Sequence, residues 1–501
     1  MNSDYQRLLD LLAEVSDLNA ASAVLNWDEL TYMPEGGARA RGEQQATLSR
    51  LAHEAFTSDQ MGALLSSLEA QGVGAGDEPA DQVVHETRIQ YDRNRLVPSD
   101  WVSRHTAAAS QSYQSWAKAR DQKEFSIFSP DLKTQLALAK ELGSYVPTAA
   151  DPYQGLLFFH EPDFTVEELD RLFSDLAGFL SPLLAEISAG SDRVDRSWTS
   201  QDWPEADQWR AFRLGTEAIG FDYDHGRLDP TIHPFETSFD RDDVRITTRI
   251  IPDDLFSGFF GSLHEAGHGL YERGLPEAFR RTPMAQAPSS GMHESQSRLW
   301  ENLVGRSPAF WQFFFPRLVA LFPSQLKGRS AEDVYRTVNW SGPSFNRTEA
   351  DEVSYNLHVI LRFRLERRLF SGELAVDDLP QAWRQESRAL FGVEPKDDLT
   401  GVLQDVHWSF GGFAAFPSYT LGNVIAAQLM AKARQDLPTL DQSFSAGDFA
   451  PLLQWLRSNV HQHGARYTTK QLVQRASGQP FGIGAYRTYI EDKYRTLYGL
   501  R

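Results

Sequence analysis

The 501-residue sequence contains no cysteine. Disulfide bonds, thiolate metal ligands and a cysteine nucleophile are therefore excluded. Any metal ion must be bound by histidine and carboxylate side chains. The absence of cysteine also fits a reducing compartment.

Positive charge is also scarce, because 49 Lys and Arg residues stand against 68 Asp and Glu residues, giving a formal net charge of −19. Such a surface repels polyphosphate, and no basic run with interleaved aromatic residues offsets it. We therefore expect no nucleic-acid partner.

Long apolar runs are missing as well. No segment approaches the roughly 20 uninterrupted apolar residues of a membrane span. The amino-terminal residues lack a positively charged region followed by an apolar core, so they do not resemble a signal peptide. We therefore expect no membrane association and a cytoplasmic location.

Helical spacing of apolar residues dominates what is present. Residues 165–168 (TVEE) form a capping box that predicts the start of a helix. Residues 348–351 (TEAD) predict the start of another helix, which Gly372 would end. The apolar stripe nearest the amino terminus consists of Leu8, Leu11, Leu12 and Val15.

Strand signals are few, and the best is the alternating, β-branched segment 243–251. The sequence has no repeat and no long linker. We therefore predict a mainly α-helical protein with one small β-sheet, forming a single unit over residues 1–501.

The segment 255–274 (LFSGFFGSLHEAGHGLYERG) predicts a buried helix that Gly274 can end. It contains His264 and His268, which lie on one helical face because they are four residues apart. Both imidazoles can therefore reach one cation. Glu265 lies one step round the helix, where its carboxylate can act as a general base on water at that cation.

The spacing of the two histidines distinguishes this motif from the other His-Glu pairs in the chain. His-Glu pairs occur at five places in the chain, and only the pair at 264 has a second histidine four residues after the first. A catalytic zinc ion needs three protein ligands. Glu294 follows 26 residues after His268, which leaves room for a turn and a second helix. His293 competes for the same role, and spacing alone does not separate a ligand at Glu294 from a surface carboxylate.

The sequence resembles the thermostable carboxypeptidase family, often called carboxypeptidase Taq. Family-like segments also occur at 25–34 (LNWDELTYMP) and 461–467 (HQHGARY). Position 346 is Asn where some members have Ile. The family's six main motifs appear in order as HPF (233–235), DVRIT (243–247), HEAGH (264–268), HESQ (293–296), NRTEAD (346–351) and GVLQDVHW (401–408).

This resemblance implies a helical metallopeptidase with a deep active-site groove. Residues 1–150 would form one wall of the groove, and residues 230–425 would carry the metal and substrate motifs. The enzyme would be a homodimer that releases single C-terminal amino acids from peptides with broad specificity, except proline. Each chain would hold one zinc ion (Zn²⁺), which cobalt can replace, and Glu294 would be its third ligand.

Three residues are candidates for contact with the substrate near the metal. His407 would stabilise the oxyanion or bind substrate nearby, and Tyr419 is a second candidate for that task. Arg347 is a candidate for the free carboxylate of the peptide, because a guanidinium can grip a carboxylate with two hydrogen bonds. The alternative for Arg347 is an ion pair with Asp351.

Arg245 is another candidate for the carboxylate, or for limiting access at the end of the groove. Its strand could also pair with the peptide backbone by edge addition. The alternative is an ordinary ion pair with Asp243. We interpret His233 as structural and do not expect His461 or His463 to bind the metal.

Two other functions remain open from the sequence. One is an oligoendopeptidase on a similar helical scaffold. The other is a catalytically silent binding protein, although such a protein has no chemical need for Glu265.

Overall fold

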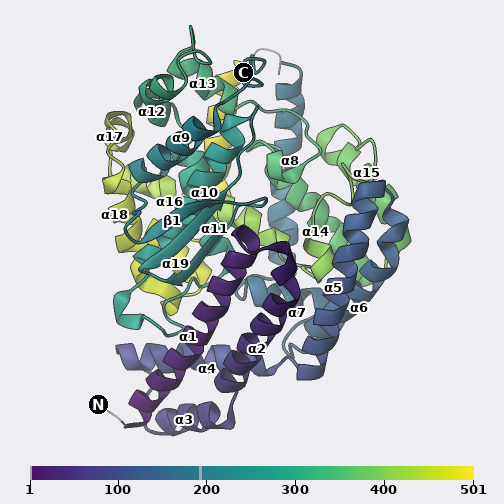
Figure 1. The fold of residues 1–501 in the computed structure, drawn as a ribbon, viewed down its shortest axis with the longest axis vertical. Helices are drawn as coiled ribbons and strands as arrows, with labels where there is room; N and C mark the ends of the chain where they lie inside the picture. The colour runs from purple at the N-terminus through teal and green to yellow at the C-terminus, as the bar shows by residue number, and fades with distance from the viewer. Residues whose placement is uncertain (1–2, 191–193, 501) are drawn as a thin grey trace.

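The computed structural model describes residues 3–190 and 194–500. Its described part is mainly helical with one three-stranded sheet, which confirms the predicted fold class (Figure 1). The first helices are α1 (Ser3–Thr31), α2 (Ala38–Phe56), α3 (Asp59–Ala70), α4 (Pro79–Arg95), α5 (Ser99–Gln122), α6 (Ser129–Ser144), α7 (Pro152–His160), α8 (Val166–Ser188) and α9 (Glu205–Ala218).

The three strands follow α9 and precede the helix that carries the His-Glu motif. They are β1 (Gly226–Pro230), β2 (Glu236–Asp240) and β3 (Asp243–Thr248). The later helices are α10 (Leu255–Gly274), α11 (Ser290–Arg298), α12 (Pro308–Leu321), α13 (Ala331–Val338), α14 (Tyr355–Ser371), α15 (Leu379–Phe391), α16 (Phe416–Asp436), α17 (Leu440–Ala446), α18 (Ala450–Asn459), α19 (Thr469–Ser477) and α20 (Gly484–Tyr498). The π-helical turn Leu299–Val304 continues directly from α11.

Local sequence signals placed several helix ends correctly. Helix α8 begins after Thr165, whose side chain and that of Glu168 form the predicted capping box. Helix α14 ends before Gly372, which adopts a φ of 81°. Helix α10 spans the predicted residues and ends at Gly274.

The predicted start of α14 at Thr348 is wrong. Residues Arg347–Glu349 form a separate short 3-10 turn, and the amide of Thr348 donates to the side chain of Asn346. The carboxylate of Asp351 then accepts hydrogen bonds from the amides of Val353 and Ser354. The chain therefore turns before α14 begins at Tyr355, because these side chains satisfy amides outside a continuous helix.

The sheet has the order β1-β3-β2, with β1 parallel and β2 antiparallel to the middle strand β3. Strand β3 ends at Thr248, three residues earlier than predicted. Its last partner on β1 is Pro230, which has no amide hydrogen to extend the ladder. The sheet packs against α10, where a Cβ on Gly269 would lie 3.0 Å from the Val244 side chain.

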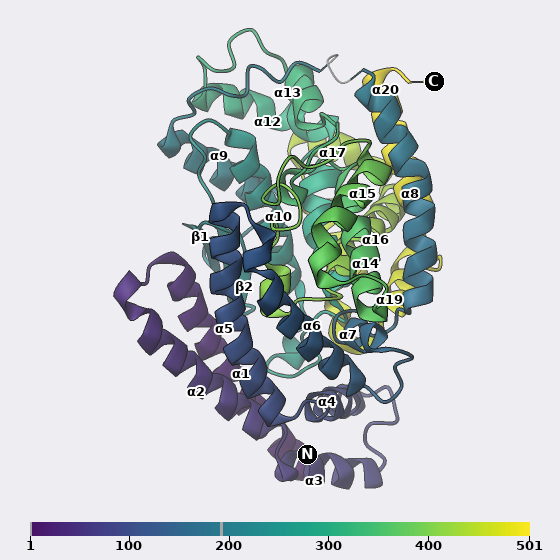
Figure 2. The same ribbon diagram turned by 90° about the vertical axis from the view of Figure 1, so that its right-hand side faces the viewer.

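The buried apolar residues form two clusters. The larger one joins helices from α5 to α20, and the smaller one joins α1, α3 and α4. Figure 2 shows α1 and α2 on the opposite side of the molecule from α14–α16. Among the described residues, no helix has both the length and the apolar character that a membrane span needs.

Two glycines allow α10, α11 and α16 to approach closely around Glu294. A Cβ on Gly267 would lie 2.7 Å from the carbonyl oxygen of Gln296. A Cβ on Gly422 would lie 2.5 Å from the Cγ atom of Glu294. Both distances are too short for nonbonded atoms, so α11 is held directly between the backbones of its two neighbours.

We predict that Gly267→Ala destabilises the fold by about 1–3 kcal/mol, because the added methyl group overpacks the contact between α10 and α11. The measurement is the free energy of unfolding in urea. The matched control is Gly178→Ala in α8, where an added Cβ meets nothing within 4 Å. The control should gain roughly 0.4–1 kcal/mol from reduced backbone entropy. Equal stability of the two variants would contradict the close approach.

Candidate metal centre and active site

Helices α10 and α11 bring the three predicted metal ligands together. The Nε2 atoms of His264 and His268 lie 3.6 and 3.4 Å from the Oε2 atom of Glu294. One donor atom from each residue lies within 4.8 Å of the others, as a group that could hold a metal ion. Two imidazoles and one carboxylate are the donor types of a catalytic zinc site.

The competing ligand His293 faces a different partner. Its Nε2 atom lies 2.8 Å from the Oε1 atom of Glu272. Its ring stacks on the ring of His268 with 4.5 Å between centroids. Burial, followed by the nearby His293, lowers the pKa of His268 to about 3. His268 therefore stays neutral, which is the form that binds metal.

Two further charged residues orient this group. The Nδ1 atom of His264 lies 2.9 Å from the Oε2 atom of Glu301, so the Nε2 atom is directed toward Glu294. Arg298 donates from Nε to Oε1 of Glu294 at 2.7 Å and from Nη1 to Glu301 at 3.2 Å. Burial acts to raise the pKa of Glu294, but Arg298 and His264 hold it well below its usual range.

Arg298 and Glu301 were missed in the sequence analysis. The signal that could have found them is the helical spacing of Glu294, Arg298 and Glu301 directly after the His-Glu pair at 293. Charged residues at such spacing share one helical face. A carboxylate that holds the second nitrogen of a metal-binding histidine is a common feature of metal sites.

Glu265 is buried, with 7% of its surface exposed, and it forms no hydrogen bond or ion pair with another described residue. Burial raises the pKa of its carboxyl to about 7, although His264 opposes the shift. A carboxyl group with a pKa near neutrality can both accept and return a proton. Its position beside His264 on α10 matches the role predicted for it.

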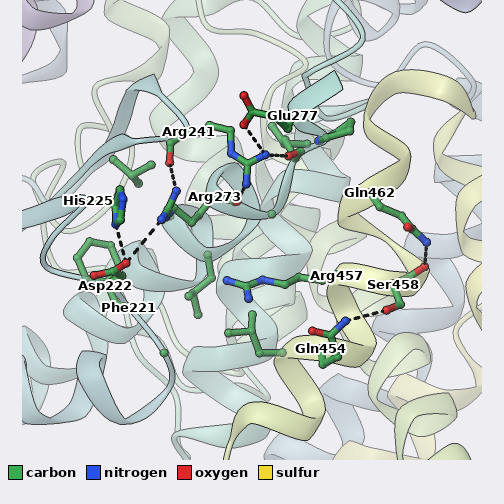
Figure 3. A pocket seen from close by; sticks show the side chains of 18 residues that line it. Phe221, Asp222, His225, Arg241, Arg273, Glu277, Gln454, Arg457, Ser458 and Gln462 are labelled. Carbon is green, nitrogen blue, oxygen red and sulfur yellow. Dashed lines mark hydrogen bonds and ion pairs between the residues drawn. The ribbon is translucent and has the colours of Figure 1, made fainter. Parts of the chain in front are cut away.

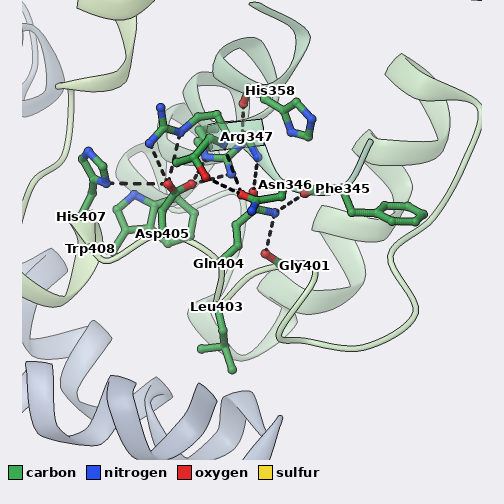
Figure 4. Close-up of polar contacts among 12 residues, drawn as sticks. Phe345, Asn346, Arg347, His358, Gly401, Leu403, Gln404, Asp405, His407 and Trp408 are labelled. Carbon is green, nitrogen blue, oxygen red and sulfur yellow. Dashed lines mark hydrogen bonds and ion pairs between the residues drawn. The ribbon is translucent and has the colours of Figure 1, made fainter. Parts of the chain in front are cut away.

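Arg347 forms an ion pair, but with Asp405 rather than with the expected alternative Asp351 (Figure 4). Its Nε and Nη2 atoms donate to Oδ1 of Asp405 at 3.2 and 2.9 Å. The other oxygen of Asp405 accepts from Arg362 at 2.6 Å. One carboxylate therefore serves two buried guanidinium groups, which leaves a net positive charge.

His407 and Tyr419 lie beside this arginine cluster. The His407 Nε2 atom and the Tyr419 hydroxyl oxygen are 3.0 Å apart. Burial and the nearby Arg347 lower the pKa of His407 to about 4, and burial raises the pKa of Tyr419. Both side chains are therefore neutral near pH 7. The guanidinium carbon of Arg347 lies 4.9 Å from the centre of the Tyr419 ring.

Tyr355 connects the arginine cluster to the metal-binding group. Its hydroxyl oxygen accepts a hydrogen bond from Nη1 of Arg347 at 2.9 Å. Its ring lies under Arg298, with 4.2 Å between the ring centre and the guanidinium carbon. Arg298 also binds Glu294. Arg347, His407 and Tyr419, three of the four predicted substrate-binding residues, therefore belong to one network with the metal-binding group.

Arg245 lies outside this network. Its guanidinium donates to both oxygens of Asp243 at 2.9 Å and stacks on the rings of Trp27 and Phe239. The expected edge addition of a peptide to its strand is wrong, because β3 is the middle strand and pairs on both sides.

The remaining histidines differ in their environments. His233, interpreted as a packed structural residue, is exposed. His461 is buried, and its Nε2 atom lies 3.0 Å from the Oε1 atom of Gln296. Gln296 lies on a different face of α11 from Glu294, so His461 does not join the donor group. His463 is half-buried and faces Tyr467.

The paired histidines, the acidic third donor and the adjacent buried glutamate have the arrangement expected of a metallopeptidase site. The family model described as carboxypeptidase Taq (M32) metallopeptidase matches residues 7–494. The chain belongs to this family, which confirms the resemblance in its sequence and makes it a metallocarboxypeptidase that requires a divalent metal ion.

Relatives and solved structures agree with this assignment. The chain is 42% identical to thermostable carboxypeptidase 1 of Thermus thermophilus, over 99% of both chains. It is 36% identical to carboxypeptidase 1 of Bacillus subtilis, over 98% of both. The crystal structure of an M32 carboxypeptidase from Deinococcus radiodurans is similar with a TM-score of 0.95 and 37% identity, covering 99% of this chain and 100% of that one.

We predict that Glu301→Gln weakens metal affinity by about 10- to 100-fold, because the neutral amide holds the His264 ring less firmly. Equilibrium dialysis against a divalent cation measures the effect. The control is Glu332→Gln at an exposed position on α13, which should bind metal like the unmodified protein. Unchanged affinity in both variants would remove Glu301 from the site.

Proposed function

We propose that this enzyme releases single C-terminal residues from peptides with broad side-chain specificity, proline being resisted. The observation that carries the proposal is the network that joins the three-donor group to the buried Arg347 cluster, with the unpartnered Glu265 directly beside the donors on α10. It combines the groups that a carboxypeptidase needs: a metal site, a proton carrier and an anion site.

His264, His268 and Glu294 would hold one divalent cation per chain. Zinc is the expected ion because the donors are two imidazoles and a carboxylate, and cobalt is expected to replace it. When bound, such an ion supplies Lewis-acid polarisation and lowers the pKa of water.

The proton transfers fall to Glu265. Its carboxylate takes a proton from the attacking water and later delivers that proton to the leaving amine. Its pKa of about 7 suits both steps, because the group loses and regains a proton at little cost near neutral pH. The absence of a competing partner leaves both oxygens available to the reactants.

His407 and Tyr419 would act on the oxygen of the scissile carbonyl. Both are neutral, and their mutual hydrogen bond uses one of their two N–H and O–H protons, so the pair has one proton left to donate to that oxygen. The donors become more valuable as negative charge develops on that oxygen during attack. Their mutual hydrogen bond restricts the orientation of the Tyr419 hydroxyl before substrate arrives.

Arg347 would bind the terminal carboxylate of the peptide. A guanidinium has five N–H donors. Asp405 and Tyr355 accept from three of its nitrogen atoms, which leaves one further N–H on each terminal nitrogen. Arg347 and Arg362 carry two positive charges and Asp405 carries one negative charge, so the cluster keeps a net positive charge that attracts an anion.

We also propose a homodimer in the cytoplasm, with residues 1–501 as one catalytic unit. Residues 1–150 form one wall of the groove, and residues 230–425 carry its chemistry. Arg245, held against Trp27 of α1, lies where these two parts meet and would limit access there. The support is family membership, and sedimentation of the purified protein at the mass of two chains tests the dimer.

We predict that Glu265→Gln lowers kcat by at least about 100-fold while metal content stays near one ion per chain. The amide keeps the size of the side chain but cannot accept the proton. Steady-state kinetics on a short peptide and elemental analysis give the two readouts. Near-normal turnover in this variant would show that another group is the base.

We predict that Arg347→Gln abolishes the preference for peptide acids over the matching peptide amides. Binding is measured by calorimetry in the Glu265→Gln background, so that no peptide is consumed. The acid-to-amide ratio is the readout because a general loss of stability affects both ligands. An equal loss for both peptides would refute the assignment of Arg347 to the carboxylate.

Digestion of an unmodified peptide, with and without added zinc or cobalt, tests the function itself. Stepwise loss of single C-terminal residues is expected, with a stop before proline. Internal cleavage would instead indicate an oligoendopeptidase. Bound metal without any cleavage would indicate a silent binding protein.

A further inference from the structure

Figure 3 shows a cavity of about 590 Å³ that is lined in part by α10. Gly269, Leu270 and Arg273 of α10 line it. These residues point about 100–200° round the helix axis from His268, because each residue advances the helix by about 100°. The cavity is therefore separate from the site described above.

Three arginines line the cavity, and two of them are paired. Arg241 lies 2.9 Å from Glu277, and Arg273 lies 2.5 Å from Asp242. The third, Arg457 on α18, is half-buried and forms no ion pair, hydrogen bond or ring contact with any residue between 3–190 or 194–500. In Figure 3 its side chain extends into the middle of the cavity.

An unpaired charge in a partly desolvated position is costly, and an anion would relieve that cost. Burial, followed by repulsion from Arg273 and Arg241, lowers the pKa of Arg457. Asp222, an acidic side chain that also lines the cavity, is already engaged by His225 at 2.6 Å and by Arg273 at 3.6 Å. Three carboxylates therefore equal the three arginines in number, but all three are engaged by Arg241, Arg273 and His225, so the Arg457 guanidinium is left for a ligand and no free carboxylate is left for an ammonium group.

Apart from the charged residues and His225, most of the lining is apolar. From α18 and the turn after it, the polar residues that line the cavity beside Arg457 are the neutral Gln454, Ser458 and Gln462. An apolar pocket with a few placed polar groups is typical of small-molecule sites. The apolar walls are formed by Phe221, Val244, Leu270, Leu275 and Leu453.

We propose that this cavity is a second ligand site, which binds a small organic acid with a single carboxylate and an apolar body. Arg457 holds the carboxylate, and the apolar walls cover the body. A strongly hydrated multivalent anion such as phosphate does not match a single unpaired guanidinium, because the other two arginines of the lining are already paired with carboxylates.

The test uses the metal-loaded full-length enzyme and N-acetyl-L-leucine, with N-acetyl-L-leucinamide as the uncharged probe. Hydrogen exchange resolved by mass spectrometry reports on residues 450–459 and 269–277, so binding at the metal-binding group is read separately. The acid should slow exchange in both segments, and the amide should not. The Arg457→Gln variant should need at least about ten times more N-acetyl-L-leucine for the same protection.

Arg336→Gln on α13 is the matched control, since Arg336 is also half-buried and forms no ion pair or hydrogen bond within the described part of the chain. It should respond to the acid like the unmodified enzyme. The proposal is overturned if Arg457→Gln responds normally, if the amide protects as well as the acid, or if only inorganic phosphate protects these segments. Peptide hydrolysis by Arg457→Gln should stay within about twofold of normal, so that this test and the test of the proposed function fail independently.

Discussion

The donor group depends on backbone contact among three helices. Glu294 reaches His264 and His268 only because Gly267 and Gly422 let α11 lie between α10 and α16 without intervening side chains. A side chain at either position would push the carboxylate away from the imidazoles. Interiors are packed too densely to absorb such a change locally. The positions of the three donor side chains are therefore set by two glycines that take no part in the chemistry.

Buried charge is the second constraint on this region. Glu294, Glu301 and Asp405 are all buried or nearly so, and each is bound by at least one arginine. Removing one partner from such a network is costly, since it leaves an uncompensated charge. The network therefore holds the side chains that we propose to meet the substrate in fixed positions.

Features that depend on local sequence were predictable. The His264–His268 pair, the capping box at Thr165 and the end of α14 at Gly372 follow from spacing over a few residues. Features that depend on distant contacts were not. Arg347 pairs with Asp405, 58 residues away, rather than with Asp351, four residues away, because Asp351 is occupied by the turn before α14.

The third candidate metal donor and the order of the strands also depend on distant contacts. Spacing left Glu294 undecided until family resemblance favoured it, since only the packing of α10 on α11 brings it to the histidines. The alternation in residues 243–248 predicted a strand but could not show that it lies in the middle of the sheet. Strand order depends on β1 and β2, whose sequences carry weak signals.

The π-helical turn after α11 determines how the helix would respond to a change in chain length. A π-turn holds one residue more per turn than an α-helix and frequently occurs at functional sites. Loss of one residue there would let the segment return to α geometry and keep its hydrogen bonds. Glu301 would then rotate by about 100° away from His264. A deletion at this point therefore removes the carboxylate that supports His264, the proposed metal ligand, without unfolding the helix.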